Sequence, residues 1–316
     1  MYVHPLRQSH FQHFEMSSPT SEDNIQELIR LTPPELMERY RQETGVKGEI
    51  SYKLKYLQTA ASHDAPPDGV VSRAIHVIKH CLQIREVLNI DKILDESYFP
   101  PDIVSQLEEW SSLSVVGDDS RGSPVIYFNL KKFNPHKYAK LWEAGTREVP
   151  PGFRGHPELD DPCVVNLCSL WYVRMMEWIH EHRFDSVKEP KVVMVLNIEA
   201  ASLSTYSYEL RQFLKGIRTL GGYLFPEICD YIYAANVPWV ADRAWSIIKL
   251  ILHPETVQKV DLCDKSRTKK TLPLKIPEKS LPICFGGLYV PETEFKRTHT
   301  EGDDESEPPI KRVHSS

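Results

Sequence analysis

The sequence predicts an α/β domain preceded by a small helical unit, and three observations lead to this expectation. Apolar residues recur at helical spacing between 70 and 84, which is typical of an amphipathic helix. Residues 191–198 (KVVMVLNI) form a near-continuous apolar run, which suits a strand that is covered on both faces. Shorter β-rich runs alternate with helical patterns in the second half of the chain. Such alternation indicates a sheet layered with helices.

The first hundred residues are expected to be helical, apart from their start. Residues 1–20 are polar and aperiodic and are expected to be disordered. Residues 32–35 (TPPE) have the composition of a helix start, with Thr as the cap, so a helix of about ten residues should follow. Another helix is expected over 48–60, and residues 66–69 (PPDG) form a turn before the helix that begins at 70.

The helical unit is expected to end at 98–101 (YFPP), after which the pattern alternates. A loop rich in Gly, Pro and Asp covers 145–162, and the charged tail over 292–316 is expected to be disordered. The helical unit is thus assigned to 21–100 and the main domain to 101–291. The strands are expected at 112–116, 124–128, 191–198 and 231–235, and the further helices at 165–179, 204–220 and 240–252.

Composition and charge exclude several classes of function. The formal net charge is −6, so no global basic field attracts nucleic acid or an anionic membrane. No apolar run approaches the roughly 20 residues that span a bilayer, and the first residues lack the apolar core of a secretory signal. We therefore expect a cytoplasmic protein with no nucleic-acid partner, in which the six cysteines are reduced thiols.

Sequence signatures of catalysis are missing. The chain has no GxSxG, GxGxxG or HExxH motif and no Gly-rich phosphate loop. Its 13 histidines are scattered, and neither they nor the cysteines form a recognisable set of metal ligands. Asp160 and Asp161 are interpreted as part of a solvated loop rather than as an acid/base pair. The protein is therefore expected to be no enzyme and to use no cofactor or metal.

The apolar helix expected over 240–252 must cover something apolar, because a helix of this composition in solvent would favour aggregation. Composition alone favours a core helix, and a cover over a ligand is the alternative. Immediately afterwards, Pro254 suits the first position of a short helix, with Thr256 and Lys259 following on one face. Free N–H groups, a hydroxyl and an ammonium make a candidate anion site, although such triplets also occur on ordinary surfaces.

The order of five short segments resembles the CRAL-TRIO lipid-binding family, and within it the Sec-fourteen-type phosphatidylinositol-transfer branch. The similarity covers roughly residues 48–290. One departure is Ser123, which stands where the family has Arg. The matching segments are Asp119 with Gly122, Pro124 and Val125; Phe225-Pro226-Glu227; Asn236-Val237-Pro238-Trp239; Leu250-Ile251-Leu252 followed by Pro254, Thr256 and Lys259; and Leu281-Pro282 with Phe285-Gly286-Gly287.

The resemblance implies a mixed sheet as floor, a helical wall, and a mobile gating helix that opens a pocket at the membrane. In the family branch, two hydroxyl-bearing strand positions hold phosphatidylcholine. Val192 and Met194 stand at these positions, and neither can donate a hydrogen bond to a phosphate. The second ligand is therefore expected to be more apolar than phosphatidylcholine. The implied pocket and gate residues are Val192, Met194, Trp245, Ile248 and Ile251.

The resemblance also implies a headgroup site. Glu227 would hold inositol hydroxyls, and Thr256 and Lys259 would hold the phosphate. Lys55 falls where the branch has an Arg, so the charge is kept but the two-pronged guanidinium is lost.

We therefore expect a carrier that holds one phosphatidylinositol-like lipid and exchanges or presents it during transient contact with a membrane. The four headgroup positions favour this hypothesis over a carrier of a small hydrophobic molecule, such as a tocopherol or a retinoid, which has no need for them. A third hypothesis is a lipid-regulated module that binds a protein partner, for example a small GTPase or a membrane complex. The tail and the loop over 145–162 would then be its partner surfaces.

Overall fold

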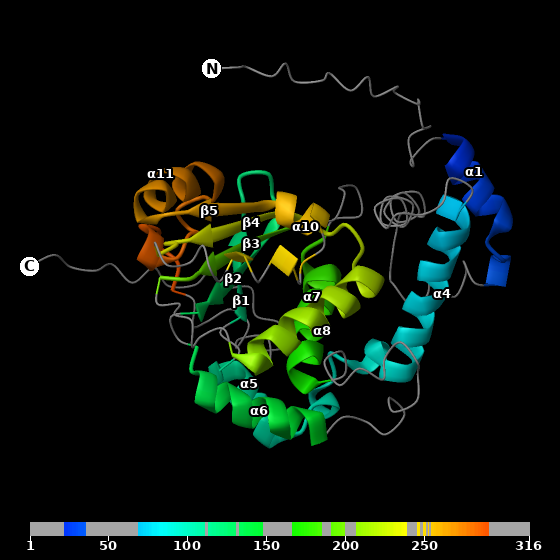
Figure 1. Ribbon diagram of the computed structural model, residues 1–316, viewed down its shortest axis with the longest axis horizontal. Helices are drawn as coiled ribbons and strands as arrows, with labels where there is room; N and C mark the ends of the chain where they lie inside the picture. Colours follow the sequence, from blue (N-terminus) through cyan, green and yellow to red (C-terminus); the bar gives the residue numbers. More distant parts are fainter. Residues whose placement is uncertain are drawn as a thin grey trace, which may run out of the picture.

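A mixed sheet with helices on both faces forms the centre of the molecule (Figure 1). The computed structural model describes residues 22–35, 69–110, 113–130, 133–147, 166–184, 191–199, 207–238, 245–246, 249–250, 252 and 254–290. The strands are β1 (Leu113–Asp118), β2 (Pro124–Asn129), β3 (Val192–Asn197), β4 (Cys229–Ala235) and β5 (Val260–Cys263). The helices are α1 (Glu22–Leu31), α4 (Val70–Leu88), α5 (Pro101–Trp110), α6 (Pro135–Arg147), α7 (Leu167–His182), α8 (Tyr208–Leu224), α10 (Pro254–Gln258) and α11 (Lys265–Lys275), with short 3-10 turns at Ile90–Lys92, Glu96–Tyr98 and Ile283–Phe285.

The strands are ordered β1-β2-β3-β4-β5 in a single sheet. β1 and β2 form an antiparallel hairpin, whereas β2, β3, β4 and β5 run parallel to one another. Parallel neighbours need long crossover connections, and here helices lie between them in the chain: α6 and α7 after β2, α8 after β3 and α10 after β4. The predicted α/β class and mixed sheet are confirmed. Because parallel strands start at the same edge, the residues that precede β3, β4 and β5 gather there.

The two faces of the sheet belong to two hydrophobic clusters, because successive side chains of a strand point to opposite faces. Val115 and Ile126 belong to the larger cluster, which the helices α4 to α8 share. Val193 and Val195 belong to a smaller cluster that includes Leu272 of α11. β3 is thus covered on both faces, which explains why its sequence is a continuous apolar run.

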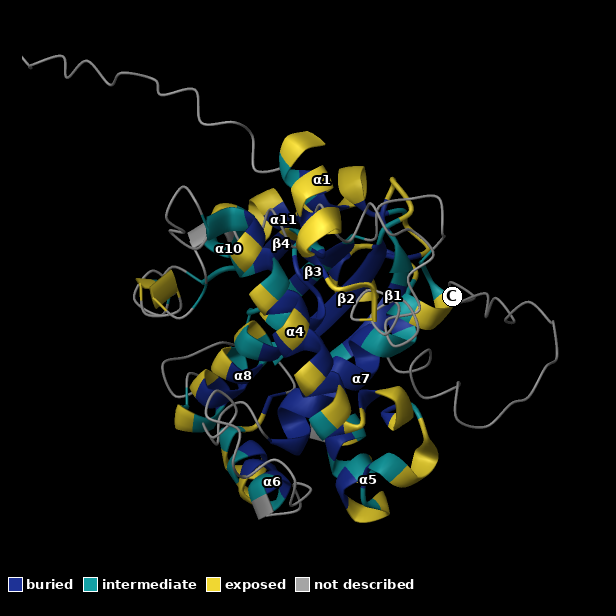
Figure 2. Ribbon diagram, turned by 90° about the vertical axis from the view of Figure 1, so that its right-hand side faces the viewer, coloured by how far each residue is buried: buried dark blue, intermediate teal, exposed yellow. Residues whose placement is uncertain are grey.

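The N-terminal helices share the larger core with the sheet. α1 packs on α4, and α4 packs on α8. The outer side of α1 faces solvent (Figure 2), while its Ile25 and Leu28 are buried against the core. The guanidinium of Arg174 in α7 donates to the carbonyl oxygens of Ile93, Leu94 and Asp95 at 2.6, 3.0 and 3.0 Å. The segment near the end of the helical unit is therefore held by a buried cation of α7.

Helix α1 and the start of the next helix differ from the expectation. α1 was not predicted, although its two buried positions have helical spacing. Thr32, expected to cap the following helix, donates its hydroxyl to the carbonyl oxygen of Leu28 at 2.6 Å and so closes α1. Pro34 and Glu35 are helical, and the rest of that helix and the helix expected over 48–60 lie outside the described residues.

Two further helices, α5 and α6, lie almost entirely in stretches for which the sequence predicts no element. α5 begins at Pro101, although the sequence predicts the end of the helical unit at 98–101. Proline is in fact favoured at the first helical position, where no N–H is needed. The sequence also does not predict α6, which extends to Arg147, three residues into the loop expected over 145–162. The helix expected over 204–220 spans Tyr208–Leu224, where the hydroxyl of Ser207 accepts from the Leu210 N–H at 3.3 Å and caps it.

The helix expected over 240–252 is described only in part. Trp245, Ser246, Lys249 and Leu250 are helical, and Leu250 is 77% exposed. None of the helices within the described ranges combines the length and the apolar composition needed to cross a bilayer.

Candidate functional site

Two oppositely charged residues meet where β4 and β5 begin. Glu227 precedes β4 by two residues, Lys259 precedes β5 by one, and the two strands pair in parallel. The ammonium Nζ of Lys259 donates to Oε2 of Glu227 at 2.8 Å. Their side chains are 27% and 18% exposed, so the pair lies at the surface of the edge without being fully solvated. A carboxylate and an ammonium thus sit side by side, with free area toward solvent.

Thr256 lies beside this ion pair in the chain, within the short helix α10. Its carbonyl oxygen accepts the N–H of Lys259 at 3.1 Å, and its side chain is partly exposed. Lys259 therefore stands in the turn that leads from α10 into β5, rather than within a helix. The structure brings Glu227, Thr256 and Lys259 to one edge of the sheet, while Lys55 lies outside the described residues.

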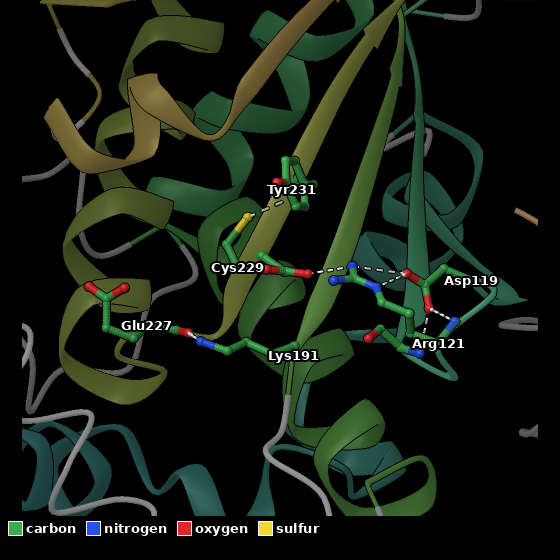
Figure 3. Close-up of polar contacts among 8 residues, drawn as sticks. Asp119, Arg121, Lys191, Glu227, Cys229 and Tyr231 are labelled. Carbon is green, nitrogen blue, oxygen red and sulfur yellow. Dashed lines mark hydrogen bonds and ion pairs between the residues drawn. The ribbon is translucent and has the colours of Figure 1, made fainter. Parts of the chain in front are cut away.

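A third charged residue, Lys191, lies at the same edge and was not among the predicted site residues. It precedes β3 by one residue, and its ammonium donates to the carbonyl oxygen of Glu227 at 3.0 Å (Figure 3). A signal for it existed in the sequence, because Lys191 is the charged first residue of the strand predicted over 191–198. Only the parallel pairing of β3 with β4 places it next to Glu227.

Cys229 lies among these charges as the first residue of β4. Burial raises the pKa of its thiol to about 12, although Lys259 and Lys191 pull it the other way. The thiol is therefore protonated at neutral pH and contributes no charge to the edge. Like Cys81, Cys168, Cys263 and Cys284, it is a reduced thiol outside any disulfide.

The predicted pocket residues of β3 point to the helical face of the sheet. Val192 is 1% exposed and packs in the larger core, whereas Met194 and Leu196 on the same face are only partly buried. The apolar surface that remains uncovered on β3 thus lies further along the strand than Val192. Trp245 is partly exposed, and Ile248 and Ile251 lie outside the described residues.

The model of the CRAL/TRIO domain family matches residues 111–287, which is more than half of the chain. The chain belongs to the CRAL/TRIO domain family. The match includes the whole sheet and the edge that carries Lys191, Glu227 and Lys259.

Relatives of this CRAL/TRIO protein match shorter segments. Over 93 residues it is 34% identical to the SEC14 cytosolic factor of Yarrowia lipolytica, and the matched segment covers 29% of this chain and 18% of that protein. Over 104 residues it is 29% identical to a CRAL-TRIO domain-containing protein of Saccharomyces cerevisiae, covering 32% and 33%. The matched segments thus span a third or less of these relatives. A crystal structure of Sfh5 covers 81% of this chain and 84% of its own, with a TM-score of 0.57 and 12% identity, and so supports the fold alone.

The first CRAL/TRIO segment, around Asp119, forms the turn between β1 and β2. Oδ1 of Asp119 accepts the N–H groups of Arg121 and Ser123 at 2.8 and 2.9 Å, and Gly122 has a φ of +82°. Such a turn needs a short acceptor side chain and a residue that tolerates positive φ. Ser123 brings no guanidinium, but Arg121 supplies one nearby. Its Nε and Nη2 donate to Oδ2 of Asp119 at 3.1 Å (Figure 3). The same guanidinium also pairs with Asp230.

The last CRAL/TRIO segment turns the chain back against the sheet, and its two glycines are needed for different reasons. Gly286 has a φ of +91°, and a Cβ on Gly287 would overlap the carbonyl oxygen of Leu281.

We expect Gly287→Ala to lower the free energy of unfolding by roughly 1–3 kcal/mol, as overpacking does. Gly222→Ala in α8 is the control, because a Cβ there meets nothing within 4 Å, so stability should stay or rise slightly. Thermal melting measures the stability of both variants. A Gly287→Ala protein that melts at the same temperature as the Gly222→Ala protein would contradict this account.

Proposed function

We propose that this CRAL/TRIO domain is a non-enzymatic carrier that holds one phosphatidylinositol-like lipid and exchanges or presents it at membranes. Membership of a lipid-binding family supports a hydrophobic lipid ligand. The choice of an inositol headgroup rests on one observation, the contact between Glu227 and Lys259 at the edge of the sheet.

The chemistry of this contact fits an inositol phosphate better than the other common headgroups. A carboxylate only accepts hydrogen bonds and so suits the hydroxyls of inositol, which choline lacks. An ammonium has three donors, so Lys259 can keep Glu227 and still bind a phosphate oxygen. Lys191 and Lys259 together place two positive charges around one carboxylate, which leaves the group attractive to a phosphate.

The acyl chains need an apolar surface between the sheet and the helices. Met194 and Leu196 offer such a surface on the helical face of β3, because they are apolar and incompletely covered. Burying this surface under acyl chains would be favourable by about 25 cal/mol for each Å² removed from water. The side chains of Met194 and Leu196 cannot donate a hydrogen bond to a phosphate. This supports a headgroup site at the strand starts, with the acyl chains further along β3.

The proposal predicts that the purified protein binds one lipid per chain and transfers it between vesicles. Native mass spectrometry should detect one phospholipid per chain, and transfer of phosphatidylinositol should exceed that of phosphatidylcholine. Tocopherol offered in parallel distinguishes the alternative carrier, because preferential uptake of tocopherol would replace the inositol assignment. Absence of any bound or transferred lipid would contradict the proposal as a whole.

A further inference from the structure

We propose that Lys191 is a positioning residue of the headgroup site. Lys191 holds Glu227 in the backbone conformation that directs the Glu227 carboxylate to Lys259. The inference rests on the proposed function, because the task of that carboxylate belongs to it. It connects Lys191, Glu227 and Lys259, which lie at the starts of β3, β4 and β5.

Glu227 has a backbone conformation that its side chain disfavours. Its φ is +52°, in the left-handed region where Cβ crowds the following carbonyl. Residues other than glycine keep such a conformation only where their surroundings enforce it. The neighbouring residues are held, since the Phe225 N–H donates to the Gly221 oxygen at 2.9 Å and the Ile228 oxygen accepts from Val192 at 2.8 Å.

The peptide of Glu227 itself is held by Lys191. The ammonium donates to the Glu227 carbonyl oxygen at 3.0 Å, in a partly buried position that strengthens a charge-assisted hydrogen bond. A return of Glu227 to negative φ would reorient its backbone and strain or break this bond. Figure 3 shows the carboxylate of Glu227 pointing away from Lys191 while its carbonyl oxygen meets the ammonium. The side chain is thereby left for Lys259, at 2.8 Å.

Two variants separate positioning from other roles of Lys191. Lys191→Met keeps the length of the side chain and removes the donor, whereas Lys191→Arg keeps a charged donor. We expect Lys191→Met to lower transfer of phosphatidylinositol between vesicles about fivefold or more, with tocopherol transfer unchanged. Lys191→Arg should stay within about twofold of the wild type. Lys137→Met is the control, because Lys137 forms an exposed ion pair with Glu109 at 2.9 Å.

Hydrogen exchange provides a readout that does not depend on the identity of the lipid. Amide hydrogens over 225–231 should exchange faster in Lys191→Met than in the wild type, and in Lys191→Arg they should not. If the wild type does not prefer phosphatidylinositol, the proposed function fails, whatever the variants do. If the wild type prefers it and Lys191→Met changes neither selectivity nor exchange, the positioning role is wrong while the function stands. If Lys191→Arg loses as much transfer as Lys191→Met with unchanged exchange, Lys191 acts on the ligand directly and the positioning role is again wrong.

Discussion

Replacing Lys259 by alanine is expected to reduce transfer of phosphatidylinositol about tenfold or more, while uptake of tocopherol stays within about twofold. A charge-assisted hydrogen bond contributes roughly 1.5–3 kcal/mol, and 1.4 kcal/mol corresponds to a factor of ten in affinity. The loss should be larger than that of one hydrogen bond, because the Glu227 carboxylate then loses its 2.8 Å partner and repels the phosphate. An uncharged ligand makes no use of either charge and should be spared.

Two further variants make this result specific. Lys265→Ala removes another lysine of an ion pair, with Glu199 at 3.2 Å, but its side chain is 70% exposed and lies on α11, so transfer should not change. Lys259→Ala combined with Glu227→Ala should abolish the preference for inositol, and the two effects should not add, since the residues are in contact. Equal loss of both ligands would mean that the pair is structural. No change with either ligand would favour the tocopherol-type carrier or the protein-interaction module instead.

Replacing Glu177 by alanine is expected to lower the free energy of unfolding by about 3 kcal/mol. Glu177 in α7 accepts from Arg85 of α4 at 2.7 Å, and the side chain of Arg85 is only 4% exposed. Removing one partner of a buried pair costs about 3–5 kcal/mol, because the other charge stays buried without compensation. Asp91 keeps one contact with Arg85 at 3.1 Å, which places the loss at the lower end of that range.

Urea unfolding followed by circular dichroism measures this loss, and the slope against urea shows whether the transition stays cooperative. Glu109→Ala is the control, because its ion pair with Lys137 is exposed on both sides and should contribute less than about 1 kcal/mol. Glu177→Gln keeps the volume and an acceptor, so it should lose less than the alanine variant. A Glu177→Ala protein as stable as the control would show that α4 is held to the domain by apolar packing alone.

Local hydrophobic patterns were sufficient to predict the elements in which such a pattern is strong. β3 was predicted because a strand buried on both faces must be apolar throughout, and α4 and α7 because their buried positions recur at helical spacing. The sequence does not predict α5, because its opening proline is also a residue that ends helices. β5 is only four residues long, and α11 has a proline at position 273 and only Thr268 and Leu272 buried, so neither has a strong pattern.

The residues of the candidate site could also be predicted from the sequence only in part. Glu227, Thr256 and Lys259 were found in the sequence through a family resemblance, and a local pattern suggested an anion site at the last two. No local pattern predicts the contact between Glu227 and Lys259, which are 32 positions apart and whose Oε2 and Nζ atoms lie 2.8 Å from each other. This contact and the role open to Lys191 depend on the folded chain, because the parallel pairing of β3, β4 and β5 brings the starts of the three strands to one edge. Hydrophobic periodicity is a property of each segment alone, whereas the meeting of charges depends on which strands become neighbours.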